Sequence, residues 1–232
     1  MSKKSKITLS EMWSYVDFGK FSTWSLIFSN LAVIFFAIID KLSAIDVLWI
    51  YWAQSVIIGI FNFVKMLLLK EFSTEGFKQG NKVVLPTKAV KISTALFFLF
   101  HYGFFHFIYA VFLSSFSSFG VSHSGSLNIN YFYYSSIIFF INYLIEFINL
   151  FREPAAETPN LGKIMFAPYA RIIPMHLTII LGGFIAAAGS AFSADTNLMI
   201  IVLFTGIKTV VDMISHSANL FSLAKVEAKE SV

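Results

Sequence analysis

The chain has 232 residues, of which 57% are hydrophobic and only 13% are charged, against about 25% charged residues in a typical soluble domain. With a mean hydropathy of +0.74, this composition excludes an ordinary soluble domain and predicts a protein whose main partner is the lipid bilayer. The absence of cysteine excludes disulfides, thiolate metal sites and cysteine nucleophiles. The net charge of +4 does not indicate a nucleic-acid partner, because the basic residues gather at the ends of apolar segments.

The first 21 residues are predicted to form a cytoplasmic segment that lies on the membrane surface. Thr8-Leu-Ser-Glu11 resembles a capping box at a helix start. Leu9, Met12 and Val16 then repeat at helical spacing. We therefore expect a short amphipathic helix over residues 8–20, anchored at the interface.

Residues 22–218 are predicted to form one all-α domain, a bundle of six transmembrane helices. Each apolar stretch is about 20 residues long, which matches a bilayer core of about 30 Å. The stretches are continuously apolar, which favours helices over the alternating strands of a barrel. A cytoplasmic tail over residues 219–232 follows the last helix. The six expected spans are Ser22–Ile39, Ile45–Leu69, Val90–Phe116, Asn130–Phe151, Ala170–Phe192 and Asn197–Ala218.

The basic residues predict the orientation of the bundle. Six crossings put both termini on one side, together with the loops at 70–89 and 152–169. Of the 17 lysines and arginines, all except Lys41 lie nearer to that side. The positive-inside rule therefore predicts that both termini are cytoplasmic.

Polar residues inside the predicted helices are costly in the bilayer and so indicate function. Most of them fall within about 15 Å of the cytoplasmic boundary, as judged from the helical rise. They recur at steps of three or four on two of the helices, so each set lies on one face. The cluster consists of Asn62, Lys65, His101, Asn142, Glu146, Asn149, Arg171, His176, Lys208, Asp212 and His216.

Imidazole and carboxylate groups are ligands for zinc, iron and manganese, so this cluster predicts a divalent-metal site. Asp212 and His216 are four residues apart and could bind one ion from one helix face, with His101 and His176 completing the shell. Glu146 is predicted to be a further ligand or a general base, and the site can be catalytic or structural. The residues expected to contact substrate or to support the ligands are Asn62, Lys65, Asn142, Arg171 and Lys208.

Other interpretations of the cluster stay open. Its charges can simply pair with one another near the interface, where long cations extend toward water. The chain could be an ion- or proton-coupled transporter of a small solute. It could carry haem b between His101 and His176, which are expected at similar depth on separate helices. It could also be an accessory subunit of a larger membrane complex, or form a homo-oligomer. His106 is expected to be a core or interface histidine, because it lies on another face of its helix than His101.

Three runs of the sequence resemble a family of prokaryotic polytopic membrane proteins, known only as a domain of unknown function. They are His101-Tyr-Gly-Phe-Phe, Pro168-Tyr-Ala-Arg-Ile-Ile-Pro-Met-His-Leu-Thr-Ile-Ile-Leu-Gly182 and Lys208-Thr-Val-Val-Asp-Met-Ile-Ser-His216. The resemblance spans roughly residues 25 to 220 and implies a multi-pass protein of the prokaryotic cytoplasmic membrane. It also implies that the polar residues within these runs are signature positions of the family. An acidic residue often stands in the family where this chain has Gln54, and a further histidine stands near Tyr109, so an outer site is expected to be missing. The family implies no activity.

Overall fold

The computed structural model describes residues 43–79, 82–115, 129–152, 158–189 and 196–230, together with isolated positions between 24 and 39. Within these ranges, only the backbone is described for residues 78, 79, 82, 146, 151, 186, 187, 189 and 214–230. The predicted amphipathic helix over 8–20 lies outside the described residues, and so does almost all of the first predicted span.

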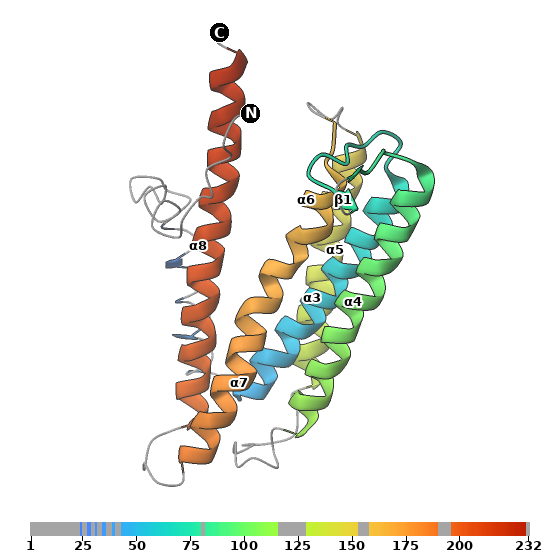
Figure 1. Cartoon of the computed structure of the whole chain (residues 1–232). Coiled ribbons are helices and arrows are strands. Elements are labelled where there is room, and N and C mark those ends of the chain that lie inside the picture. Colours follow the sequence, from blue (N-terminus) through green and yellow to red (C-terminus); the bar gives the residue numbers. More distant parts are fainter. Residues whose placement is uncertain are drawn as a thin grey trace.

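Long apolar helices run up and down through the described part of the chain (Figure 1). Among the residues that the structure describes, five helical stretches are long and apolar enough to cross a membrane. They are α3 (Ala44–Leu68), α4 (Lys88–Ser115), α5 (Ile129–Arg152), the run of α6 (Leu161–Phe166), the 3-10 segment η2 (Ala167–Arg171) and α7 (Ile172–Gly189), and α8 (Thr196–Glu230). These correspond to the second to sixth predicted spans. The chain is therefore a helical protein compatible with multiple membrane crossings.

One predicted boundary was wrong. The expected loop at 152–169 ends early, because Asn160 caps α6 by accepting a hydrogen bond from the backbone N–H of Lys163 at 2.9 Å. Pro168 does not stop this helix, because it lies in the first turn of η2, where its fixed φ angle is compatible with a helix. The last helix continues to Glu230, so the segment predicted as a tail from residue 219 is helical as far as that residue.

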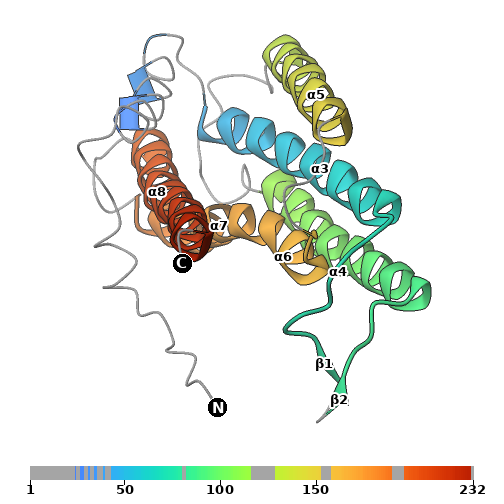
Figure 2. The ribbon, with the colours of Figure 1, turned by 90° about the horizontal axis from the view of Figure 1, so that it is seen from above.

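Helix α3 is the centre of the bundle. It packs against α4 and α5 and also contacts α6, η2, α7 and α8, and Figure 2 shows α5 and α8 on opposite sides of it. Helix α7 packs along α8. The buried core includes Tyr51, Phe98, Tyr109, Met175 and Phe204. Much of the remaining helix surface is apolar and exposed, as expected for helices that face lipid.

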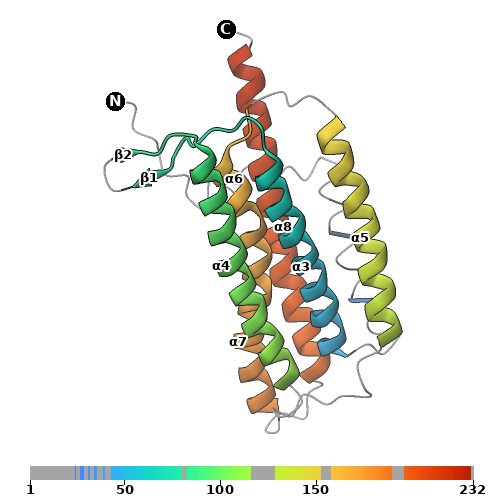
Figure 3. The same ribbon diagram turned by 90° about the vertical axis from the view of Figure 1, so that its right-hand side faces the viewer.

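The two ends of the bundle differ. At the end where α3 stops, a short hairpin of β1 (Lys78–Gln79) and β2 (Lys82–Val83) lies beside α4 (Figure 3). Ser73 of this loop exchanges backbone hydrogen bonds with Pro159 and Leu161, which ties the loop to the start of α6. We call this the hairpin end. At the opposite end, the backbone N–H of Ala44 donates to Asn197 Oδ1 at 2.6 Å and so joins α3 to α8.

Candidate functional site

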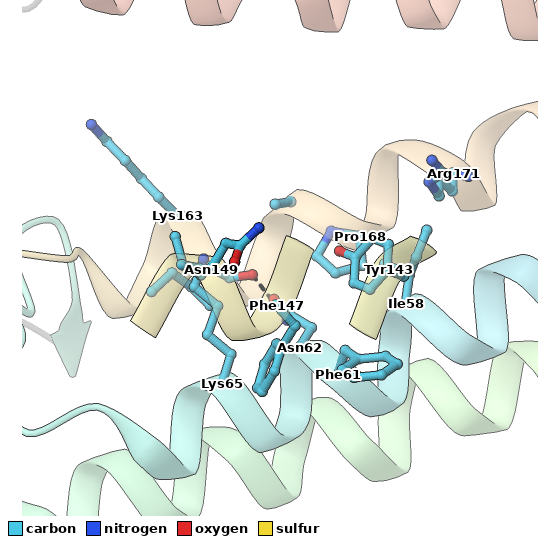
Figure 4. A pocket seen from close by; sticks show the side chains of 13 residues that line it. Ile58, Phe61, Asn62, Lys65, Tyr143, Phe147, Asn149, Lys163, Pro168 and Arg171 are labelled. Carbon is cyan, nitrogen blue, oxygen red and sulfur yellow. Dashed lines mark hydrogen bonds between the residues drawn. The ribbon is translucent and has the colours of Figure 1, made fainter. Parts of the chain in front are cut away.

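A cavity of about 870 Å³ lies between α3, α5 and the α6–η2 segment, toward the hairpin end. Figure 4 shows the side chains that line it. Part of its wall is apolar and comes from Phe61, Phe147, Leu150, Ile164 and Pro168. The polar and cationic part consists of Asn62, Lys65, Tyr143, Asn149, Lys163 and Arg171.

Pro168 and Asn62 together shape the base of this wall. The backbone carbonyl of Ile164 would accept a hydrogen bond from the residue four positions later in an α-helix, but that residue is Pro168, which has no N–H. Asn62 Nδ2 donates to the Ile164 carbonyl at 3.0 Å instead. An unsatisfied carbonyl is costly in a membrane, so this bond stabilises the contact between α3 and α6.

Arg171 lies between two aromatic rings. Its guanidinium carbon is 6.0 Å from the ring centroid of Tyr51 on α3 and 6.0 Å from that of Phe139 on α5. These distances permit cation–π attraction, which favours a guanidinium in a poorly solvated place. Asp212 on α8 is within electrostatic range of the Tyr51 hydroxyl, but its carboxylate is paired with Lys208 Nζ at 2.5 Å.

Two histidines that were predicted to share a metal or a haem pair with tyrosines instead. His101 Nδ1 on α4 lies 2.8 Å from the Tyr169 hydroxyl in η2. Tyr109 on α4 places its hydroxyl 3.2 Å from Nδ1 of His176 on α7. His101 and Tyr109 are eight positions apart on α4, which is about 12 Å of helix.

His101 and His176 therefore lie at levels about two turns apart, and the expectation of similar depth was wrong. The estimate from span boundaries failed because α6 and η2 extend the helix of His176 by more than two turns. Two imidazoles that ligate one haem iron must lie on either side of it at one level. This arrangement does not fit that requirement.

The remaining predicted ligands do not assemble within the described side chains. No three histidine, aspartate or glutamate residues there form a group that could hold a metal ion. Glu146 and His216 belong to α5 and α8, but their side chains lie outside the description. Of the predicted supporting residues, Asn62, Lys65 and Arg171 line the cavity, whereas Lys208 pairs with Asp212 and Asn142 is exposed away from the lining.

A buried hydrogen-bond network between α3 and α4 was not expected from the sequence. His106 is only 4% exposed, which confirms its assignment as a core histidine. Its Nδ1 lies 2.9 Å from the carbonyl of Tyr102, so this nitrogen carries the proton and donates, and Nε2 accepts from Ser55 Oγ at 2.9 Å. The Tyr102 hydroxyl is 2.7 Å from Ser55 Oγ, and the Trp52 indole N–H donates to the His106 carbonyl at 2.8 Å.

Sequence reasoning also missed Lys163, Tyr109 and Tyr169 as site residues. Lys163 was counted only for orientation. The tyrosines carried no signal in a chain in which 18% of the residues are aromatic.

A comparison with known protein families identifies the family to which the chain belongs. A family model described as "Family of unknown function (DUF6498)" matches residues 12–230. The chain belongs to this family. This confirms the resemblance to a domain of unknown function over nearly the whole chain. No curated protein and no solved structure matches.

Proposed function

We propose that this membrane protein binds a small organic anion in the cavity between α3, α5 and α6–η2. The observation that supports this most is the charge of the lining, to which Lys65, Lys163 and Arg171 contribute cations. Asn62 and Asn149 add amide groups to the same wall. A site of this composition attracts a carboxylate, sulfonate or phosphate.

The position of the cations strengthens the proposal. Arg171 is partly buried within a segment that can span a membrane, where a cation is costly unless an anion or a polar group compensates it. Lys163 is exposed, and in Figure 4 it extends away from Asn62 and Lys65, so it belongs to the rim. Because fields are stronger in a low-dielectric wall than in water, an anion gains more from Lys65 and Arg171 than it would at a surface.

The basic hairpin end is proposed to face the cytoplasm, so the cavity would lie in the cytoplasmic half of a prokaryotic cytoplasmic membrane. The ligand would then enter from the cytoplasm or from the inner leaflet. If the protein is an ion-coupled transporter, the same cavity would be its inward-facing binding site. Uptake of a bound anion into proteoliposomes would separate transport from simple binding.

Binding of hexylphosphonate and hexanoate to the protein in non-ionic detergent, measured by calorimetry, tests the proposal. We expect both anions to bind and hexyltrimethylammonium not to bind. Lys65→Gln and Arg171→Gln should each reduce the binding affinity for at least one of the two anions by about tenfold, which corresponds to about 1.4 kcal/mol. The matched controls are Lys88→Gln and Arg152→Gln, two exposed cations of the hairpin end that do not line the cavity. Equal effects of all four variants, or no anion binding, would overturn the proposal.

A divalent-metal site is the second candidate, on one observation. Helix α8 is continuous from Thr196 to Glu230, so Asp212 and His216 are one turn apart on one helix, as a two-ligand site requires. We expect about one zinc, iron or manganese ion per purified chain, and loss of that ion in His216→Ala and in Asp212→Asn. His176→Ala tests whether a further predicted ligand contributes. The control is His123→Ala, which lies between the third and fourth predicted spans and outside the predicted site. A wild-type protein free of metal would end this proposal.

A further inference from the structure

The cationic groups of the cavity lie at two separate levels along the bundle rather than at one. Asn62 is level with Ile164, to which it donates a hydrogen bond, and Lys65 follows Asn62 by one turn toward the hairpin end. Arg171 is level with Tyr51, whose ring lies beside its guanidinium. In Figure 4, Arg171 is set apart from the group of Asn62, Lys65 and Asn149.

The separation of these two places follows from the helical rise. Ile164 and Arg171 are seven positions apart, and Tyr51 and Asn62 are eleven positions apart on α3. At about 1.5 Å per residue in an α-helix and about 2.0 Å in the 3-10 segment η2, these intervals correspond to about 12 Å and about 16 Å along the bundle. A single carboxylate or phosphate is too small to contact Lys65 and Arg171 together across such a distance.

The described side chains between these two positions include several aromatic and apolar ones. The Phe61 ring lies 5.4 Å from that of Tyr143 and 5.1 Å from that of Phe147, measured between centroids. These rings join α3 to α5 and line the cavity together with Ile58. They offer contact to a hydrocarbon or planar spacer.

The two ends also differ in chemistry. Lys65 is a compact point charge on the hairpin-end side of Asn62, with the exposed Lys163 in the same lining, and such lysines suit a phosphate that keeps part of its hydration. Arg171 has a planar fork of donors held between two rings, which suits the two oxygens of a carboxylate. We propose that the ligand is two-ended, with a phosphate-type group at Lys65, an apolar spacer past Phe61, and a carboxylate-type acceptor at Arg171. This inference rests on the proposed function, because it assumes that the cavity binds anions.

Phosphonoalkanoic acids of different lengths test this, with alkylphosphonates of equal length as the comparison. The probes should have extended lengths of about 5, 12 and 20 Å, chosen to bracket the spacing estimated from the helices. We expect the 12 Å phosphonoalkanoic acid to bind about tenfold more tightly than its alkylphosphonate counterpart, and the other two lengths to show no such advantage.

Three substitutions, at two positions, identify which end of the ligand each residue binds. Arg171→Gln should abolish the advantage of the carboxylate, so that the 12 Å phosphonoalkanoic acid binds no more tightly than its alkylphosphonate counterpart. An unchanged thermal unfolding temperature in detergent shows that the variant is folded. Arg171→Lys should retain only part of the advantage, because it keeps the charge without the planar fork. Lys65→Gln should weaken both ligand series by a similar factor and preserve the advantage, since distant anchors act additively.

The outcomes distinguish this inference from the proposed function. Tight anion binding that depends neither on length nor on the carboxylate would overturn the two-ended ligand and leave anion binding intact. No binding of any anion would overturn both. The origin of the ligand is decided by native mass spectrometry of protein extracted directly from membranes: a copurified lipid acid identifies the bilayer as the source, and displacement by a water-soluble phosphonoalkanoic acid alone identifies the cytosol.

Discussion

Tyr102 of α4 lies directly over Gly59 of α3. A Cβ atom built on Gly59 would stand 2.5 Å from Cε1 of the Tyr102 ring, closer than real side chains approach. This close approach lets the Tyr102 hydroxyl reach Ser55 one turn away, where it lies 2.7 Å from Oγ. Small residues allow such approach between membrane helices, which pack without a hydrophobic driving force between them.

Gly59→Ala is therefore expected to destabilise the protein by about 1–3 kcal/mol, because the added methyl group must displace a buried tyrosine. The change should appear as a lower thermal unfolding temperature in detergent. Gly103→Ala on α4 is the matched control, since a Cβ there meets nothing within 4 Å. Equal unfolding temperatures for the two variants would contradict the packing of Tyr102 on Gly59.

Ser55→Ala should lower the free energy of unfolding by about 0.5–2 kcal/mol, because it removes the buried partner of His106 Nε2. The Tyr102 hydroxyl loses Ser55 Oγ but keeps the Ser55 carbonyl, to which it donates at 3.1 Å. The control is Ser135→Ala on α5, whose hydroxyl only donates to the Tyr131 carbonyl of its own helix. Chemical or thermal unfolding of both variants checks this. If Ser135→Ala lowers the free energy of unfolding as much as Ser55→Ala does, the network between α3 and α4 contributes nothing specific to stability.

The predicted orientation can be measured cleanly because the chain has no cysteine. Leu85, exposed near the hairpin end, and Asn130, exposed at the start of α5, lie at opposite ends of the bundle. In intact spheroplasts, a membrane-impermeant maleimide should label the Asn130→Cys variant, and should label Leu85→Cys only after lysis. The reverse pattern would invert the proposed orientation and place the cavity in the outer half of the membrane.

Several residues of the candidate site could be predicted one by one from the sequence, but the contacts among them could not. Asn62, Lys65 and Arg171 were identified because a polar group in an apolar segment is unusual. That they share one cavity depends on the rotation of three elements about their axes, and on the bond from Asn62 to the carbonyl that Pro168 leaves without a donor. Helices that are apolar on nearly every face show little preference for one rotation, so sequence periodicity does not predict it.

The histidines illustrate the same limit. Their presence in the bundle was predicted correctly, but His101 and His176 pair with Tyr169 and Tyr109 about two turns apart instead of meeting. The error in depth came from the start of the fifth span, where Asn160 begins a helix that the composition of the segment did not indicate.

The sequence by itself determined the helical, membrane-compatible class of the protein and the approximate bounds of the apolar stretches that the structure describes. These properties are local, because a run of about 20 apolar residues must satisfy its own backbone hydrogen bonds by forming a helix. Only the tertiary structure decided which polar groups lie together. Those contacts depend on how helices distant in the chain pack and rotate. Here Gly59 permits the close approach of Tyr102, and Pro168 leaves the Ile164 carbonyl free to accept the hydrogen bond from Asn62.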